Sequence, residues 1–488
     1  MNTDLSPIGS GIDGLDDILA GGFVPGRMYL VHGQPGTGKT MLGIHFLEEG
    51  LKQGETALFV HGEESREEIL ANGAALNVDI SDAFFLDLGP DSAFFTEDYS
   101  YDLVEPSEIE QDRYTQDIYD AIREIDPDRI VIDPITQLRY VEADEYQFRK
   151  RILSFMRFLK EGNVTVLTTA TPSSDVYNTE IQSLSDGIVA LRRTDNGQRR
   201  IDVTKHRALG QKEGDNGMKI CENGIEVYPR LDTHMGERPF ETGLLTFGID
   251  QLDDLTGGGF DRGSVTFISG PTGAGKTSTG THLLAKAADK DLRSTVYLFE
   301  EDLQTYRHRS ESIGLPISEL QEAGLLSAVE IKPRTYSSEE FAHMVVDDIE
   351  ENGTDIVMID GIDGYTTAIQ GAEDDLIRKY HALTRYLKQH GVTTITTNEI
   401  PEITGISSAT DNNLSYVADN IMFLSYVEMD GSLRKVVGML KKRSGAFEHN
   451  LREFTITADG IEVGGSLTGL YGILQGTPRD NGRMESGE

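Results

Sequence analysis

The sequence predicts an α/β protein of two tandem domains, each built on a mostly parallel sheet that is flanked by helices. Three observations lead to this fold class. A glycine-rich loop motif occurs once in each half of the 488-residue chain. The segments around the two motifs repeat at nearly the same offset, which indicates a duplicated domain. Within each half, short apolar runs alternate with amphipathic stretches, and this alternation is typical of parallel sheets covered on both faces.

The two loops have the spacing of a phosphate-binding motif. Both match G-x-x-x-x-G-K-[ST], follow a short apolar run and precede a stretch of helical character, which is the context that the motif requires. The glycines let backbone N–H groups surround phosphates, the lysine meets the β/γ-phosphate charge, and the threonine hydroxyl can ligate Mg²⁺. The motifs predict two sites for a nucleoside triphosphate. They are Gly33-Gln34-Pro35-Gly36-Thr37-Gly38-Lys39-Thr40 and Gly270-Pro271-Thr272-Gly273-Ala274-Gly275-Lys276-Thr277.

The duplication extends well beyond the loops. Lys276 follows Lys39 by 237 positions, and the same offset relates Glu300-Glu301 to Glu63-Glu64. Solenoid repeats have far shorter periods, so the repeat indicates two whole domains. Between residues 230 and 242, proline, glycine and charged residues interrupt the pattern. We therefore expect a first domain over residues 1–235, a second over 236–470 and a polar, flexible tail over 471–488.

In the first half, hydrophobic periodicity predicts each element in turn. Apolar runs bounded by turn residues predict strands, and apolar residues at helical spacing predict helices. Ligands of such folds bind at the carboxyl ends of the parallel strands, where the motif residues lie. The predicted strands are 27–32, 56–61, 129–132, 164–169, 187–191 and 199–204, and the predicted helices are 39–52, 66–76 and 146–160.

An aspartate ends one apolar strand downstream of each loop. Asp133 closes Arg-Ile-Val-Ile-Asp, and Asp360 closes Asp-Ile-Val-Met-Ile-Asp. In this position an aspartate has the form of a Walker-B residue, which would hold Mg²⁺ opposite Thr40 or Thr277. The alternative interpretation is an aspartate that caps a turn. Recurrence in both halves favours the metal-binding role.

Paired glutamates follow the next strand in each half. Glu63-Glu64 and Glu300-Glu301 lie 24 and 25 residues after their loop lysines. A carboxylate there can orient or deprotonate the nucleophile that attacks the γ-phosphate, whether that is water or a protein hydroxyl. In a chain this acidic, a Glu-Glu pair is usually part of a solvated surface. Identical placement in both halves favours the catalytic interpretation.

Composition limits the classes of binding partner and indicates the cellular compartment. The chain has 44 basic and 82 acidic residues, a net charge of −38, and a single cysteine, Cys221. Such a surface repels nucleic acid and anionic membrane in ordinary salt. The acid residues are spread through both halves, so we interpret them as an adaptation to a very salty cytoplasm rather than as a field for a basic partner. No apolar run approaches the ~18 residues of a membrane span, and the first residues lack a signal region, so we expect a cytoplasmic protein.

At these residues the sequence resembles the KaiC family of RecA-like ATPases, over nearly the whole chain. The resemblance rests on residues 10–22 (SGIDGLDDILAGG), on the paired glutamates and on a Lys-x-Arg that follows a late strand. It implies two RecA-like P-loop domains, ATP and Mg²⁺ as ligands, ATPase activity and catalytic glutamates. It also implies a homo-hexameric ring with ATP at the interfaces between subunits. With the charge, the resemblance suggests a halophilic archaeal source.

The resemblance further implies that the Lys-x-Arg residues reach the γ-phosphate of a neighbouring subunit. These residues are Lys205 and Arg207 in the first half and Lys441 and Arg443 in the second. The chemistry is that of an arginine finger supplied in trans. The family usually continues with glycine and soon afterwards histidine, whereas here residues 205–211 read KHRALGQ and residues 441–447 read KKRSGAF. We therefore expect a reshaped contact loop.

Autophosphorylation is a second activity that the resemblance implies. The family's second domain can phosphorylate an adjacent Ser-Thr pair, and here Ser415 falls on the serine position while Tyr416 replaces the threonine. In the first half Gln182 occupies the acceptor position. These residues predict a single-serine autokinase in the second half, against the alternative that Ser415 is only a turn residue.

Two function classes are consistent with these features. One is an ATP-hydrolysing, autophosphorylating signalling protein of the KaiC type, and the other is a nucleic-acid-dependent ATPase for recombination or repair on the same fold. The second class needs a basic stripe or loops that mix aromatic and basic residues. The local basic clusters, such as Lys441-Lys442-Arg443, instead fall where the ATP-interface element is expected. We therefore favour the first class and expect no nucleic-acid partner.

Overall fold

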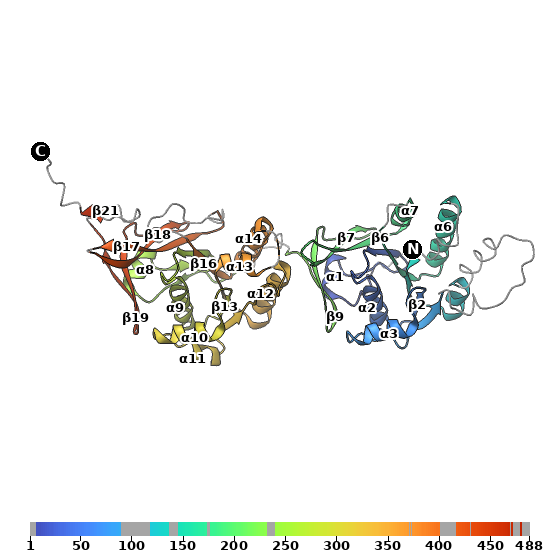
Figure 1. Cartoon of the computed structure of the whole chain (residues 1–488), viewed down its shortest axis with the longest axis horizontal. Coiled ribbons are helices and arrows are strands. Elements are labelled where there is room, and N and C mark those ends of the chain that lie inside the picture. The colour runs from blue at the N-terminus through green and yellow to red at the C-terminus, as the bar shows by residue number, and fades with distance from the viewer. Residues whose placement is uncertain are drawn as a thin grey trace, which may run out of the picture. The chain divides into compact units, whose positions relative to one another are not determined.

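The computed structural model forms two compact units, Met1–Arg230 (unit 1) and Leu231–Glu488 (unit 2). In each unit a central sheet carries helices on both faces (Figure 1). The structure describes residues 6–88, 118–135, 145–172, 176–231, 240–369, 371, 373–400, 416–429, 431–468, 470–471 and 479–480.

The sheet of unit 1 has nine strands in the order β3-β2-β4-β5-β1-β6-β7-β8-β9. Pairing from β3 to β6 is parallel and from β6 to β9 antiparallel. The strand that leads into the phosphate loop, β1, is central, so its end is enclosed by neighbouring strands. The strands are β1 (Met28–Gly33), β2 (Ala57–His61), β3 (Phe84–Asp87), β4 (Arg129–Asp133), β5 (Thr165–Ala170), β6 (Gly187–Arg193), β7 (Arg199–His206), β8 (Asn216–Cys221) and β9 (Gly224–Tyr228).

The sheet of unit 2 repeats that order, as β14-β13-β15-β16-β12-β17-β18-β19-β20. Two small antiparallel pairs, β10 with β11 and β21 with β22, accompany it. Its strands are β12 (Val265–Gly270), β13 (Ser294–Leu298), β14 (Leu326–Glu330), β15 (Ile356–Asp360), β16 (Thr393–Glu399), β17 (Asn420–Met429), β18 (Ser432–Lys442), β19 (Arg452–Thr457) and β20 (Gly460–Ser466). The small pairs are β10 (Leu244–Leu245), β11 (Phe260–Asp261), β21 (Leu470–Tyr471) and β22 (Arg479–Asp480).

The helices cover the two faces of each sheet. α1, α2 and α3 pack on one face of the first sheet and α6 and α7 on the other, while α8 to α11 and α12 to α14 do the same in unit 2. The unit 1 helices are α1 (Asp13–Ile18), α2 (Lys39–Lys52), α3 (Arg66–Ala74), α6 (Glu145–Glu161) and α7 (Val176–Leu184). Those of unit 2 are α8 (Asp250–Thr256), α9 (Lys276–Ala288), α10 (Leu303–Ser312), α11 (Ile317–Glu322), α12 (Ser338–Asn352), α13 (Ile362–Ala368) and α14 (Glu373–Gln389).

The apolar strands build a core on each side of the sheet. In β1, Tyr29 and Val31 point into the cluster under α2, whereas Met28 and Leu30 point into the cluster under α6. This alternation follows from the two-residue period of a strand. Each such buried side chain stabilises the fold by about 1.5–3 kcal/mol relative to exposure. The sequence therefore specifies a three-layer α/β/α unit, and the predicted fold class is confirmed.

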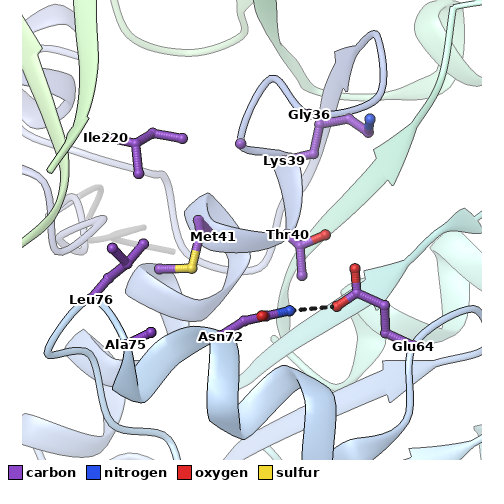
Figure 2. Close-up of a pocket in the computed structure, with 10 residues that line it drawn as sticks. Gly36, Lys39, Thr40, Met41, Glu64, Asn72, Ala75, Leu76 and Ile220 are labelled. Carbon is purple, nitrogen blue, oxygen red and sulfur yellow. Dashed lines mark hydrogen bonds between the residues drawn. The ribbon is translucent and has the colours of Figure 1, made fainter. Parts of the chain in front are cut away.

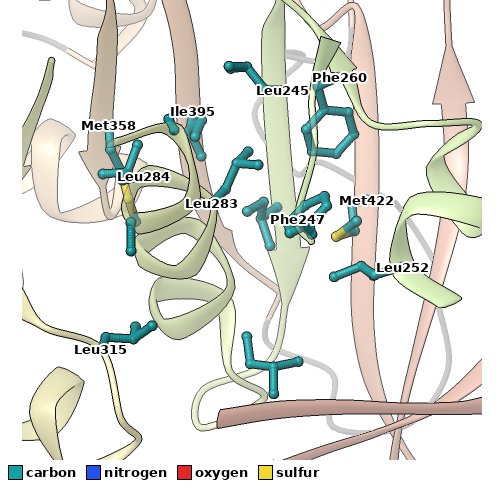
Figure 3. Packing of buried hydrophobic residues seen from close by; sticks show 14 of the residues in the cluster. Leu245, Phe247, Leu252, Phe260, Leu283, Leu284, Leu315, Met358, Ile395 and Met422 are labelled. Atoms are coloured by element: carbon teal, nitrogen blue, oxygen red, sulfur yellow. The ribbon is translucent and has the colours of Figure 1, made fainter. Parts of the chain in front are cut away.

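A glycine lets the loop helix lie close to the sheet in each unit. A Cβ on Gly280 of α9 would lie 2.6 Å from Met358 Cε, and one on Gly43 of α2 would lie 2.9 Å from Val131 Cγ1. Figure 3 shows the cluster in which Leu283 of α9 takes part with Met358. Because the loop helix is held this closely, the loop that precedes it has little freedom to move relative to the strand ends.

The predicted elements of the first half agree with the structure to within about two residues at each end. The predicted helix 39–52 is α2 itself. The edge strands β3 and β9, and β8 beside β9, were not predicted, because their short runs are only partly buried. Of the helices that the structure describes, none is both long and apolar enough to cross a membrane.

Candidate functional site

Each phosphate loop joins a buried central strand to a helix. The strand ends at the first glycine of the motif and the helix begins at the motif's lysine. The residue before the lysine has a left-handed backbone, with φ of 109° at Gly38 and 111° at Gly275, a conformation that side chains rarely adopt. A glycine-rich loop followed directly by a helix N-terminus is a typical binding site for an anion.

Both loop lysines fold back over their own loop. Lys39 Nζ donates to the carbonyl of Gly33 at 2.8 Å and that of Gln34 at 3.3 Å. Lys276 Nζ donates to Gly270 at 2.8 Å and to Pro271 at 3.0 Å. Burial lowers the pKa of both ammonium groups, and nearby carboxylates oppose that shift. A lysine held beside a glycine-rich loop in this way fits the β- and γ-phosphates of a nucleotide.

In unit 2 the strand-ending aspartate lies beside the loop threonine. Thr277 Oγ1 donates to Asp360 Oδ1 at 2.9 Å, and Thr397 Oγ1 of β16 donates to the same atom at 2.8 Å. Asp360 is buried, and burial raises its pKa while the two hydroxyl donors lower it. A carboxylate and a hydroxyl this close are hard oxygen ligands, which fit Mg²⁺ with its retained waters.

In unit 1 the equivalent aspartate is less enclosed. Asp133 ends β4 and is partly buried, and Thr169 of β5 donates its hydroxyl to the carboxylate. Thr40 lies at the start of α2, on the wall of the adjacent pocket. Both units therefore offer an aspartate and a threonine as oxygen ligands, and the aspartate of unit 2 is the more deeply buried.

The first glutamate of each pair lies near the loop lysine. Glu63 and Glu300 are among the carboxylates that raise the pKa of Lys39 and Lys276, respectively. Partial burial and then the neighbouring Asp360 raise the pKa of Glu300. A carboxyl group with a raised pKa beside the phosphate site can accept a proton from a nucleophile at neutral pH.

The second glutamate of each pair is held by the helix that follows. Asn72 of α3 donates an amide hydrogen to Glu64 Oε2 at 3.1 Å, and Arg309 Nη2 of α10 contacts Glu301 Oε1 at 2.7 Å. Partial desolvation raises the pKa of Glu64 and of Glu301, and the Asn72 and Arg309 contacts oppose those shifts. The structure thus brings every predicted glutamate to the strand ends beside its loop.

A pocket of about 390 Å³ opens beside the loop of unit 1. Figure 2 shows that Thr40 and Glu64 lie at one side and Leu76 and Ile220 at the other. Nucleotide pockets combine an apolar wall for the base with a polar end for the phosphates. The whole lining is Gly36, Gly38, Lys39, Thr40, Met41, Glu64, Asn72, Ala75, Leu76 and Ile220.

One further cation lies on each loop, and sequence reasoning did not assign it this role. Lys435 Nζ of β18 donates to the carbonyl of Gly273 at 2.8 Å, and Arg199 Nη2 of β7 donates to that of Gly36 at 3.5 Å. The two cations are 236 positions apart. The internal repeat was the signal that could have identified them. Asn72 and Arg309 were missed in the same way, although they are separated by 237 positions, the offset between the two loop lysines.

The Lys-x-Arg residues lie at the other end of the sheet from their own loop. Lys205 pairs with Ile188, and Ile188 pairs with Leu30, three residues before the loop begins. At about 3.3 Å per residue, this places Lys205 roughly 10 Å from the loop along the strand. Lys441 pairs with Ile421, which lies at the corresponding end of unit 2.

Each Lys-x-Arg segment contacts the turn before its neighbouring strand. Lys205 Nζ donates to the carbonyls of Gln182 at 2.9 Å and Ser183 at 3.0 Å, and Arg207 contacts Asp186 at 3.6 Å. Arg443 contacts Asp419 at 3.2 Å and donates to the carbonyl of Tyr416 at 2.8 Å. Ser415, the predicted phosphosite, lies outside the described residues.

The fold and the two sites define a class of protein, the tandem P-loop ATPases. A family model described as "ATPase: KaiC" matches residues 8–232 and again residues 245–468. The chain therefore belongs to the KaiC family. It is 28% identical to the "circadian clock oscillator protein KaiC" of Parasynechococcus marenigrum, covering 96% of this chain and 92% of that protein.

Two further relatives give the same result. The circadian clock oscillator protein KaiC of Thermostichus vulcanus is 28% identical over 98% of this chain and 92% of its own length. That of Picosynechococcus is 29% identical over 96% of this chain and 91% of its own length. The similarity thus spans both units rather than one copy of the domain.

Proposed function

We propose that this chain is a regulatory, KaiC-like ATPase that binds Mg-ATP at two sites and hydrolyses it at both. The proposal is supported chiefly by the arrangement at the strand ends of unit 2. There Lys276, Thr277, Asp360 and Glu300 meet at one loop, and in unit 1 Asp133 and Glu63 lie near Lys39. Lysine, threonine, aspartate and glutamate in these places supply the parts that phosphoryl transfer requires.

Each side chain has one role in the proposed reaction. The loop lysine and N–H groups hold the β- and γ-phosphates, while the loop threonine and strand-end aspartate would hold Mg²⁺, which neutralises charge on the phosphates. Glu300 in unit 2, and Glu63 in unit 1, orient the attacking water and accept its proton. The low-dielectric surroundings of Asp360 strengthen these interactions.

We also propose that the active form is a homo-hexamer with ATP at subunit interfaces. Lys205 lies roughly 10 Å along the strand from its own loop, and Lys205 and Arg207 are directed to Ser183 and Asp186 in the turn at the far end of the sheet, away from that loop. Presented to the loop of a second copy, the two cations would stabilise charge on the transferred phosphoryl group. Lys441 and Arg443 would act in the same way for unit 2.

Turnover by glutamine variants tests the hydrolysis directly. Replacing Glu63 and Glu64 together, or Glu300 and Glu301 together, is expected to slow hydrolysis at that unit by ~10²-fold or more while ATP still binds. Phosphate release is measured with the loop lysine of the other unit replaced by alanine. Unchanged turnover in both double variants would contradict the proposal.

The dependence on protein concentration tests the assembly. If Lys205 and Arg207 act in trans, the activity per chain rises with concentration as the assembly forms, and Arg207→Ala removes that rise. Light scattering on the same samples gives the assembly state. Full activity in samples that scatter as monomers would contradict a role in trans.

The second unit is further proposed to phosphorylate Ser415, because Glu300 can take a proton from a hydroxyl as well as from water. The nucleophile held in line at about 3–3.5 Å from the phosphorus is the one that reacts. Incubation with γ-labelled ATP and peptide mapping tests this. Label at Ser415 that disappears in Ser415→Ala is expected, and an unlabelled wild type would leave an ATPase without this kinase activity.

A nucleic-acid-dependent ATPase is the alternative on this fold. The net charge of −38 opposes it, because a protein that binds nucleic acid gains affinity from released counterions. The same charge supports our proposal of a cytoplasm of high salt, and with it a halophilic source. Micromolar DNA binding that persists at high salt, together with stimulated hydrolysis, would favour the alternative.

A further inference from the structure

One position contacts the second glutamate in both units, with different chemistry. Asn72 follows Glu64 by eight residues, and Arg309 follows Glu301 by eight residues. The Asn72 amide donates to Glu64 at 3.1 Å, whereas the Arg309 guanidinium forms an ion pair with Glu301 at 2.7 Å. Asn72 and Arg309 are 237 positions apart, the offset of the loops themselves. The contact is therefore duplicated, and only its charge differs.

Helix capping sets this geometry. Ser65 caps α3 through a capping box with Glu68, and Asp302 caps α10 by accepting from the Thr305 N–H. Each cap follows the glutamate pair immediately. Seven residues make about two helical turns, so the side chain at that distance returns to the face of the cap. The side chain then reaches the glutamate that precedes the cap.

The first glutamate points elsewhere. Glu300 lies over the start of α13, so closely that a Cβ on Gly361, the N-cap, would come within 2.4 Å of its Oε1 and one on Gly364 within 2.8 Å of its Cγ. The N-cap of α13, Gly361, follows directly after Asp360, the last residue of β15. Two neighbouring carboxylates thus face two different structures, one the strand end with Asp360 and the other the helix.

We propose that Asn72 and Arg309 are positioning residues, each of which clamps the second glutamate of its pair to the helix that follows. The clamp thereby fixes the short segment between strand and helix, and with it the first glutamate. The inference rests on the proposed hydrolysis, and it assigns the proton transfer of unit 2 to Glu300 and a holding role to Glu301. The clamp in unit 1 is neutral, and the clamp in unit 2 is an ion pair.

Burial accounts for the difference in charge. The Glu301 side chain is 15% exposed and that of Arg309 35%, and the guanidinium also lies 5.8 Å from the ring of the buried Tyr306. A carboxylate removed from water needs a cation beside it, whereas an exposed one is satisfied by an amide. Glu64 is more exposed than Glu301, and there the amide of Asn72 suffices.

A double-mutant cycle on the full-length chain tests the clamp. The chain carries Lys39→Ala, so that turnover comes from unit 2, and kcat and KM for ATP are measured for Arg309→Asn, Glu301→Gln and their combination. If Arg309 acts through Glu301, each single change lowers kcat about tenfold with KM within about twofold, and the combination is no worse than either single change. Arg309→Lys, which keeps the charge, is expected to retain at least about a third of the turnover.

The matched control is the same cycle in unit 1. On a chain that carries Lys276→Ala, Asn72→Ala and Glu64→Gln are expected to be non-additive too, with losses of about threefold, because an amide holds a carboxylate less strongly than a cation does. Losses that multiply to about a hundredfold in the unit 2 combination would overturn the clamp, as would a complete loss in Glu301→Gln alone. Absence of turnover in the parent Lys39→Ala chain would instead contradict the proposed function.

Discussion

Unit 1 and unit 2 share one strand order but differ in how deeply their acidic side chains are buried. Asp360 is buried and accepts from two threonine hydroxyls, whereas Asp133 is only partly buried. The second glutamate contacts an arginine in unit 2 and an asparagine in unit 1. Duplication has thus preserved the placement of the site residues while their surroundings diverged. Placement follows from the fold, whereas the local charge balance depends on single substitutions.

In the core, it is unit 1 and not unit 2 that buries a charged side chain at the start of one central strand. Arg129 begins β4 and is fully buried. It pairs with Ala57 of β2, and the counterpart of Ala57 in unit 2, Ser294, pairs with Ile356. Ile356 is therefore the counterpart of Arg129. One unit therefore has an ion pair where the other has an apolar residue. Arg129 donates to Glu55 and to the carbonyls of Gly9 at 2.7 Å and Phe46 at 2.9 Å. It ties the N-terminal segment to the sheet.

The largest effect on stability is expected at this position. Arg129→Ala leaves Glu55 and two carbonyls without their donor, so unit 1 is expected to lose about 3–5 kcal/mol of unfolding free energy. Ile356→Val in unit 2, the matched control, is expected to cost only about 0.5–1.5 kcal/mol. Urea unfolding followed by circular dichroism measures both. A loss below about 1 kcal/mol in Arg129→Ala would show that the ion pair contributes little.

A smaller effect concerns pH and unit 1 alone. Burial raises the pKa of Asp16 to about 6, although the Ser10 N–H donates to its carboxylate at 2.8 Å. A raised carboxyl pKa contributes stability at low pH that is lost as pH rises through about 6. Asp16→Asn removes this loss, so the variant is expected to gain about 1–2 kcal/mol on the wild type between pH 4 and pH 7, allowing for solvent screening.

Urea unfolding of Asp16→Asn and the wild type at several pH values gives this difference directly. Asp253 lies 237 positions after Asp16 and accepts from the Phe247 N–H at 2.7 Å, so Asp253→Asn is the matched variant in unit 2. A difference between Asp16→Asn and the wild type that stays constant from pH 4 to pH 7 would contradict the assignment to Asp16.

The smallest effect is expected at the additional loop cations. Loss of one hydrogen bond to the loop costs about 0.5–1.5 kcal/mol, so Lys435→Ala is expected to weaken ATP binding at unit 2 roughly three- to tenfold. Arg199→Ala should weaken unit 1 less, because its contact with Gly36 is 3.5 Å rather than 2.8 Å. Equilibrium binding with the other loop lysine replaced measures each. A larger effect in Arg199→Ala would reverse this ranking.

The sequence alone was sufficient for most of the fold. The run from Lys39 to Lys52 combines a glycine-rich start with apolar residues at helical spacing, and the strands around it are almost wholly apolar. The edge strand β3 escaped prediction because its residues are partly exposed and show no clear alternation. Such strands are held by pairing with a neighbour, which a local pattern does not reveal.

The site residues that belong to a sequence motif were predictable, whereas those that reach the site only through tertiary contacts were not. The loops and the residues at strand ends follow from spacing, and the structure brings Thr277 within 2.9 Å of Asp360 across 83 positions. Lys435 and Arg309 lie on elements without a motif, so nothing local distinguishes them from other surface cations. The internal repeat holds that information, but its use requires knowing which side of a strand or helix faces the loop.

The most direct test of two ATP sites is a count of bound nucleotide. Each loop lysine faces the β- and γ-phosphates, so Lys39→Ala and Lys276→Ala should each remove one class of site. Filter binding at saturating Mg-ATP is expected to give two nucleotides per wild-type chain, one per chain in either single variant and none in the double variant. A single variant that still binds two nucleotides per chain would contradict the account.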